Sequence, residues 1–281
     1  MMGERMKGQV AIVTGGSRGI GLAIGKALAA EGFAVALVAR SPEAVKEAAK
    51  AIRAGGSRAI GLSADVTDQR AVASIVAETV QQLGPVDLLV NNAGSANALG
   101  PIWEVEPDTW WRDVTTNLQG TFLCAHAVLP GMLARHRGRI LNIVSSFGMH
   151  TSPQSTPSPY ASAYSSSKAA VIVFTENLAA MARDHGVQVF GLRPGFVRTT
   201  LLEEGARSRP GKQWLPEIQA ILDSDRLVPP EHAARWAVFL ASGDADELSG
   251  RVFSVAYEMD TLVRRTDDIR REGRYILRLC E

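Results

Sequence analysis

The sequence of 281 residues is poor in cysteine, in net charge and in long apolar runs, and each scarcity excludes a class of protein. Only Cys124 and Cys280 occur, without metal-ligand spacing, so we expect no disulfide framework, no metal site and a reducing compartment. Thirty basic and 29 acidic residues leave a formal charge of +1, which gives no global attraction to nucleic acid or to anionic membranes. The apolar run near the N-terminus is too short for a signal peptide or a membrane span, so a soluble cytoplasmic protein is expected.

Short β-branched runs alternate with longer helical patterns along most of the chain. The expected strands are 10–14, 34–39, 58–63, 86–91, 139–145, 187–192 and 251–255. The expected helices are 20–31, 42–54, 68–83, 109–137, one running through Tyr164 and one after Pro230. Continuous apolar strands separated by helices indicate a parallel sheet covered on both faces. We therefore predict a single doubly wound α/β domain over residues 1–281, with a core of about 7–255 and a C-terminal extension of about 256–281.

Two segments interrupt this alternation. One is the Ser-, Thr- and Pro-rich stretch FGMHTSPQSTPSPY at 147–160, and the other is 200–230, with a short helical pattern near 215–222. Both follow strands, at the edge of a doubly wound sheet where ligands bind. They are candidate substrate walls, although ordinary surface loops would show the same composition.

The first strand runs directly into TGGSRGIG, with glycines at 15, 19 and 21. Glycines permit a tight turn and let a pyrophosphate approach backbone N–H groups at the positive end of a helix. A glycine-rich turn can also be a simple connection between strand and helix. Its position after the first strand of an alternating α/β chain favours dinucleotide binding.

The stretch YSSSK places Tyr164 one helical turn before Lys168, and Tyr160 lies one turn earlier still. Ser158-Pro159 is typical of a helix start, which would put all three side chains on one face. A cation beside a phenol lowers its pKa from about 10 toward neutrality, so that the hydroxyl can exchange a proton with a substrate. An incidental Tyr–Lys pair on an amphipathic helix is the competing interpretation.

Five motifs occur in order: TGGSRGIG, NNAG at 91–94, a serine closing the fifth strand, YSSSK, and RPGFVRT. Together they resemble the short-chain dehydrogenase/reductase family, with a pattern similar to NADP-preferring 3-oxoacyl reductases, over residues 7–255 or so. The resemblance implies a Rossmann-type sheet of about seven strands, a nicotinamide cofactor, and hydride transfer to or from a carbonyl carbon. It also implies a homodimer or homotetramer, with contacts through the 109–137 and Tyr164 helices.

The resemblance implies the catalytic residues Ser145, Tyr164, Lys168 and Asn117. Tyr164 is the expected acid/base, Lys168 lowers its pKa and binds the nicotinamide ribose, and Asn117 supports a proton relay, unless its side chain makes only structural hydrogen bonds. Ser145 fits the family's S-x-x-G frame and would polarise the carbonyl, with Ser146 as the alternative, because successive strand residues point to opposite faces. Tyr160 is at most a pocket-lining residue.

NADP(H) is the expected cofactor, because the second strand ends in Ala39 where an acid would bind the 2′-hydroxyl of NAD(H), and Arg40 follows. Arg18 adds a second guanidinium suited to a 2′-phosphate. Asp65 resembles the family's adenine contact, although it could equally cap the next helix. The complete set of expected cofactor contacts is Gly15, Ser17, Arg18, Gly19, Ile20, Gly21, Arg40, Asp65, Val66, Asn92, Ala93, Gly94, Tyr164, Lys168, Pro194, Gly195, Val197 and Thr199.

The function predicted from these residues is NADP(H)-dependent interconversion of a ketone and a secondary alcohol. An NAD-dependent alcohol dehydrogenase and a cofactor-binding regulator without turnover are the alternatives. Three departures from the family leave substrate and subunit packing open: Phe190 where asparagine is frequent, a long segment between Ser145 and Tyr164, and RVFSVAYEMD in place of a paired-glycine turn. A small-molecule carbonyl or alcohol is the expected partner.

Overall fold

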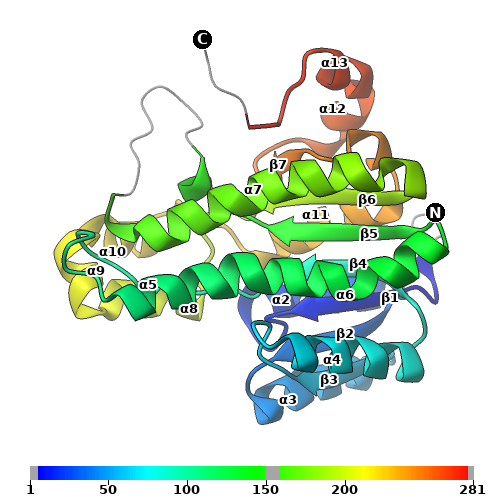
Figure 1. Ribbon diagram of the computed structural model, residues 1–281, viewed down its shortest axis with the longest axis horizontal. Coiled ribbons are helices and arrows are strands. Elements are labelled where there is room, and N and C mark those ends of the chain that lie inside the picture. The colour runs from blue at the N-terminus through cyan, green and yellow to red at the C-terminus, as the bar shows by residue number, and fades with distance from the viewer. Residues whose placement is uncertain (1–5, 150–158, 278–281) are drawn as a thin grey trace.

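The computed structural model describes residues 6–149 and 159–277, which build one seven-stranded parallel sheet with helices on both faces (Figure 1). The strand order is β3-β2-β1-β4-β5-β6-β7. The strands are β1 Val10–Thr14, β2 Ala34–Ala39, β3 Ala59–Ser63, β4 Val86–Asn91, β5 Gly138–Ile143, β6 Val187–Arg193 and β7 Val252–Ser254. The predicted Rossmann-type fold is therefore confirmed.

Each of the two faces of the sheet packs against a separate layer of helices. Ala11 and Val13 of β1 face one apolar cluster, whereas Ile12 between them faces the other, as the alternation of side chains along a strand requires. The first layer holds α2 (Gly19–Ala30), α3 (Pro42–Ala54) and α11 (Pro230–Ser242). The second holds α4 (Gln69–Gln82), α6 (Gly120–Ala134) and α7 (Ser162–Ala182). Burial on both faces explains why these strands are apolar throughout.

The strand order reverses between β1 and β4, because β1 pairs with β2 on one side and with β4 on the other. Helices that follow β1 and β4 leave toward opposite faces at this point, which opens a crevice at the carboxyl ends of the strands. This geometry positions the site described below.

The helix expected over 109–137 is interrupted. It consists of α5 (Pro107–Val114), a π-helical turn Thr115–Gln119 and then α6. The turn contains Asn117, whose buried side chain bonds to Ser95 and Ser167. A π turn inserts one extra residue and so re-aims a side chain, an effect that periodicity alone does not reveal.

The start of α7 (Ser162–Ala182) also differs from expectation. Pro159–Ala161 forms a 3₁₀ turn and α7 begins at Ser162, so the predicted helix start at Ser158-Pro159 is wrong. Ser158 itself lies outside the described residues, as does most of the 147–160 stretch. Tyr160 consequently sits in the turn, where its ring lies 5.0 Å from that of Trp214 rather than above Tyr164.

The segment after β6 is more helical than expected. It folds as α8 (Thr200–Arg207), α9 (Arg209–Trp214) and α10 (Pro216–Leu222), and α10 corresponds to the short pattern seen near 215–222. A bridge between Phe196 and Leu227 closes the base of this segment, and Arg198 bonds to both Glu203 and the Leu222 carbonyl. We call residues 200–222 the lid segment.

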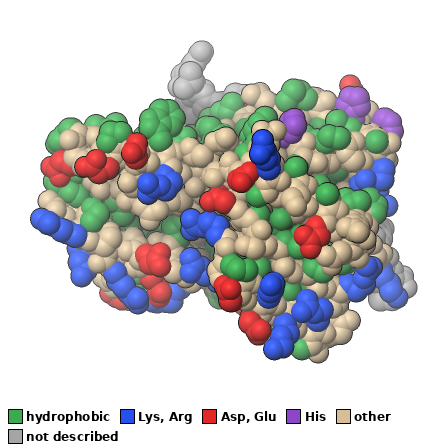
Figure 2. All heavy atoms as spheres, turned by 60° about the horizontal axis from the view of Figure 1, so that its bottom comes forward, with side chains coloured by type: hydrophobic (Ala, Val, Ile, Leu, Met, Phe, Trp, Pro, Cys, Tyr) green, Lys and Arg blue, Asp and Glu red, His purple; other side chains and the backbone are tan. Residues whose placement is uncertain are grey.

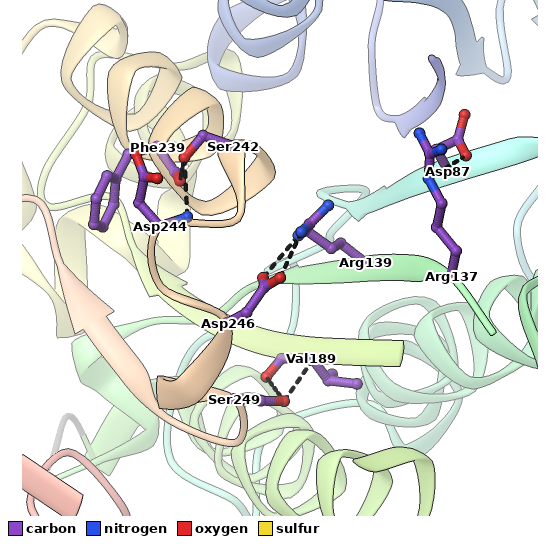
Figure 3. Close-up of polar contacts among 9 residues, drawn as sticks. All are labelled: Asp87, Arg137, Arg139, Val189, Phe239, Ser242, Asp244, Asp246 and Ser249. Carbon is purple, nitrogen blue, oxygen red and sulfur yellow. Dashed lines mark hydrogen bonds and ion pairs between the residues drawn. The ribbon is translucent and has the colours of Figure 1, made fainter. Parts of the chain in front are cut away.

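The opposite end of the sheet is joined by charged pairs (Figure 3). Arg139 on β5 makes two hydrogen bonds to the carboxylate of Asp246. Its Nε donates to Oδ1 at 2.8 Å, and its Nη2 donates to Oδ2. Arg137 Nε lies 3.4 Å from Asp87 Oδ1 on β4. These ion pairs thus lie at the amino ends of β4 and β5, and the crevice lies at the carboxyl ends of the strands.

The C-terminal residues pack on the sheet edge at β7. Leu262 of α12 (Met259–Arg264) and Ile269 of α13 (Thr266–Arg271) are buried in the core cluster, and Tyr275 O accepts from Val252 N at 2.8 Å. Figure 2 shows basic and acidic side chains interspersed on one face of the molecule. Among the described residues, no helix is long and apolar enough to cross a membrane.

Candidate active site

A cavity of about 790 Å³ occupies the crevice at the carboxyl ends of the strands. Every candidate catalytic and cofactor residue named from the sequence lines it, except Gly21 and Asn117. The residues come from the ends of β1 to β6 and from α7, so segments as far apart in the sequence as Gly15 and Thr199 meet around one hollow. The carboxyl ends of a doubly wound sheet are where such folds bind ligands.

The glycine loop is tied to the fourth strand. Thr14 Oγ1 accepts from the backbone N–H groups of Asn92 and Ala93, at 3.0 Å each. Asn92 Nδ2 donates to Thr14 O at 2.9 Å and to Gly15 O at 3.3 Å. The NNAG stretch thus shapes the turn as well as lining the cavity.

Gly21 does not line the cavity because it serves close packing. A Cβ at Gly21 would lie 2.4 Å from Gly15 O and 2.5 Å from Asn92 Nδ2. Gly15 has φ +63°, in the left-handed region that favours glycine. These two glycines therefore hold the loop in a shape that leaves α2's N-terminus open toward the cavity, the arrangement that suits a pyrophosphate.

Two arginines and one acid lie around the second- and third-strand ends. Arg18 and Arg40 are exposed, line the cavity, and make no ion pair with another described residue. Asp65 accepts from Thr67 N and Thr67 Oγ1 at 2.9 and 2.8 Å, and Asp68 caps α4 instead. The capping alternative for Asp65 is therefore wrong, and its second carboxylate oxygen stays available to a ligand.

Ser145, Tyr164 and Lys168 lie together on the cavity wall. Ser145 follows β5 with extended backbone, and its hydroxyl is hydrogen-bonded to the Tyr164 side chain. Lys168, 5% exposed, donates from Nζ to Ile143 O at 2.8 Å, and this nitrogen lies 5.7 Å from the Tyr164 ring centroid. Ser146 also lines the cavity but is exposed in the following 3₁₀ turn.

The electrostatics of this trio differ from expectation. Burial raises the pKa of Tyr164 above its ordinary value of 10, and only the hydrogen bond from Ser145 opposes this rise. Burial lowers the pKa of Lys168 to about 8. The expected fall of the Tyr164 pKa toward neutrality is therefore absent from the chain alone, because removing the phenolate from water outweighs the favourable contacts.

Asn117 stands behind this trio rather than in it. Its Oδ1 accepts from Ser95 N at 2.8 Å, and its Nδ2 donates to Ser95 O at 2.9 Å and Ser167 Oγ at 3.0 Å. A Cβ at Gly94 would lie 3.2 Å from Asn117 Oδ1 and 3.8 Å from Lys168 Nζ, so Gly94 brings the two side chains close. The side-chain amide makes the structural hydrogen bonds that the sequence left as the competing account.

A buried carboxylate that the sequence analysis missed shapes the neighbouring wall. Asp113 of α5 is fully buried and accepts from Asn97 N, Ala98 N and the Ser95 hydroxyl. These bonds wrap the loop after NNAG around one carboxylate. No short motif marks Asp113, because its partners are backbone groups of another segment.

Apolar side chains form the remaining wall. Phe147 contacts both Tyr164 and Phe196 edge to face, with ring centroids 6.0 and 6.4 Å apart. Across the cavity, Thr199 caps α8 and lies against the glycine loop, where a Cβ at Gly19 would be 3.4 Å from Thr199 Cγ2. The lid segment contributes Leu202, Leu215 and Ile218. The sequence predicted the position of this segment and its short helix near 215–222, but not α8 and α9.

Comparison with known proteins agrees with the geometry. The family model described as short chain dehydrogenase matches residues 9–209. A short chain dehydrogenase of Pseudocercospora fijiensis is 42% identical over 200 residues, which are 70% of this chain but 62% of that protein. The 2-(S)-hydroxypropyl-CoM dehydrogenase 3 of Xanthobacter autotrophicus is 34% identical, over 90% of this chain and 97% of that one.

Among solved structures, a variant of actinorhodin polyketide ketoreductase with NADPH superposes with a TM-score of 0.77 at 33% identity. The match covers 88% of this chain and 95% of that one. Fold, ordered motifs and relatives together show that the chain belongs to the short-chain dehydrogenase/reductase family, whose members are oxidoreductases that act on alcohols and ketones with NAD(P)(H).

Proposed function

We propose that this chain is an NADP(H)-dependent carbonyl reductase, which interconverts a ketone and a secondary alcohol with Tyr164 as acid/base. The observation that carries the proposal is the hydrogen-bonded pair of Ser145 and Tyr164 hydroxyls on the cavity wall, with the Lys168 ammonium behind them. Two hydroxyls converging on one point bind the oxygen of a carbonyl group.

The residues around the cavity fit a nicotinamide dinucleotide. The glycine loop and α2's N-terminus would hold the pyrophosphate, Asp65 and Val66 the adenine, and Pro194 to Thr199 the nicotinamide end. A bound nicotinamide supplies or accepts the hydride at the carbonyl carbon.

The chain's own residues manage the proton. Tyr164 donates its proton to the carbonyl oxygen during reduction, and Ser145 stabilises the negative charge that develops there. Lys168 provides a positive charge while its pKa of about 8 keeps it protonated near neutral pH. We assign Asn117 a positioning role in the proton relay, because its side-chain bonds to Ser95 and Ser167 hold the π turn beside Lys168.

Two exposed arginines support NADP(H) over NAD(H). Arg18 and Arg40 flank the end of β2, where Ala39 stands in place of the acid that an NAD(H) site requires. Neither guanidinium is paired to a described carboxylate, so each is available to a phosphate dianion.

An exposed apolar face supports a homo-oligomer. Phe122 of α6 and Phe174 of α7 make a ring contact at 6.4 Å, and Phe122 and Val173 are 46% and 43% exposed. Apolar side chains grouped on two neighbouring helices are typical of a self-association surface.

We further propose that the sheet, the lid segment and α12–α13 form one catalytic domain, because Leu262 and Ile269 share the main core cluster.

A regulator without turnover would bind the same cofactor as a carbonyl reductase, so only a measurement of ketone turnover distinguishes the two. Tyr164→Phe removes the proton donor and should lower kcat by about 10²-fold or more, with the NADPH dissociation constant unchanged. Ser145→Ala should lower kcat by a similar factor, whereas the adjacent Ser146→Ala should retain most of it. Turnover of ketones followed at 340 nm checks both, and near-normal kcat in Tyr164→Phe contradicts the mechanism.

The cofactor assignment is tested on Arg40. Arg40→Ala should raise the NADPH dissociation constant by about 10-fold or more, because a charge-assisted bond to the 2′-phosphate is lost, and should leave that of NADH unchanged. Fluorescence titration measures both, and Arg70→Ala on the exposed start of α4 is the control. Equal affinities of wild type and Arg40→Ala for NADPH would overturn the assignment.

The lowered pKa of Lys168 predicts a pH-dependent stability. Between pH 8 and 10.5 the folded chain releases this proton and the unfolded chain keeps it, so folding becomes more favourable as pH rises. From pH 8 to pH 10.5, the free energy of unfolding of the wild type should therefore rise by about 3 kcal/mol relative to that of Lys168→Met. Urea unfolding at both pH values measures the difference, and a constant difference would show that Lys168 has an ordinary pKa.

The oligomer is tested by placing charge on the apolar face. Phe122→Glu should yield a smaller particle than wild type, because a carboxylate at a buried interface lacks a partner. Light scattering after gel filtration gives the mass. Val263→Glu on α12, where the valine is 43% exposed, is the matched control. The same mass for Phe122→Glu and wild type would place the interface elsewhere.

A further inference from the structure

An apolar cluster lies beside Tyr164 at the substrate end of the cavity. Tyr164 shares one hydrophobic cluster with Leu202 and Leu215 of the lid segment, and Phe147 and Leu99 belong to the same cluster. The lid segment contributes one charged side chain to the cavity, Glu204, which is exposed. Burying a charged or hydroxylated substituent against such a wall is unfavourable, so the groups beside the carbonyl must be apolar.

A second, open groove of about 340 Å³ lies next to this end and is different in character. Asn97 and Leu99 line both hollows. Leu99 reaches across toward α8, where a Cβ at Gly205 would lie 3.9 Å from Leu99 Cδ1. Leu99 therefore separates the cavity from the groove, and a chain passing this side chain would enter the groove.

The groove is rich in unpaired hydrogen-bonding groups. The side chains of Thr109, Glu106 and Gln213 line it and bond to no other described residue. Arg209 adds a cation and Glu104 a second carboxylate, so charges of both signs line the groove. Trp214 forms an aromatic wall against Tyr160, and Gly100, with φ +127°, lets the indole approach its backbone. Donors, acceptors and an aromatic face suit uncharged hydroxyl-bearing groups.

We propose that this groove is a distal subsite for the substrate, and that the preferred substrate is an elongated, uncharged ketone, apolar beside the carbonyl and hydroxylated at its far end. This inference rests on the proposed carbonyl reductase function. It predicts a preference for such ketones over thioesters of polyanionic carriers, because the lid residues that line the two hollows carry one charge of each sign, Glu204 and Arg209, rather than a cluster of cations.

A matched series of ketones tests the proposal. 2-Alkanones of five to twelve carbons are compared with their ω-hydroxy counterparts, by kcat/KM with NADPH. In short chains the hydroxyl lies in the apolar part and should lower kcat/KM. In chains long enough to pass Leu99, the hydroxyl should raise kcat/KM about 3- to 10-fold, because it gains a hydrogen bond in the groove. The effect of one hydroxyl thus changes sign with chain length.

Two nearly isosteric changes locate the effect. Thr109→Val on α5 and Gln213→Met on α9 remove hydrogen-bonding atoms from the groove, and together they should abolish the gain for long chains and leave the loss for short chains. Glu217→Gln on the exposed side of α10 should change neither. A hydroxyl effect of one sign at every length, or a higher kcat/KM for acetoacetyl-CoA, would overturn the inference alone. Absence of turnover with every ketone and both cofactors would overturn the proposed function as well.

Discussion

The hydrogen bonds between Thr14 and the NNAG stretch hold the site together, because they join β1 and β4 where the strand order reverses. Thr14 Oγ1 accepts from two backbone N–H groups beyond β4, and the Asn92 amide returns bonds to Thr14 and Gly15. The two strands pair directly as far as Val13 and Val90, and the helices that follow them leave toward opposite faces of the sheet. A hollow lined by backbone from both strand ends is the consequence, and phosphate binding by the glycine loop requires that hollow.

On the proposed substrate side, the cavity wall is positioned by two side chains that do not themselves line the cavity. Asp113 holds the Ser95–Ala98 loop, and Asn117 holds Ser95 through both backbone groups. Neither side chain lines the cavity, yet both determine where Leu99 and Asn97 stand. Asp113 and Asn117 are fully buried, and each side chain makes several hydrogen bonds. Without these bonds, burial of the two polar groups would destabilise the fold. Substrate contacts in this fold are thus determined partly by residues that never touch substrate.

The sheet and the ordered motifs could be predicted because they follow from local patterns. Continuous apolar runs identified the strands, and β1, β2, β4 and α3 begin and end where the sequence indicates. The π turn at Asn117, the 3₁₀ start before α7 and the lid helices α8 and α9 could not be predicted, since each depends on contacts with distant segments. The missed Asp113 and the groove beside Trp214 show the same limit. A carboxylate bonded to backbone, and a glycine such as Gly100 that admits an indole, leave no signature in a single sequence.

The pKa shifts of Tyr164 and Lys168 bear on the proton transfer proposed for them. Burial favours the neutral form of both groups, and so raises the pKa of Tyr164 while it lowers that of Lys168 to about 8. Below that pH, a protonated tyrosine coexists with a charged lysine, which is the state that donates a proton to a carbonyl oxygen. Alcohol oxidation requires the phenolate, which the same burial disfavours. In the proposed mechanism, burial thus keeps Tyr164 near neutral pH in the protonated form, which is the form that donates a proton to a carbonyl oxygen.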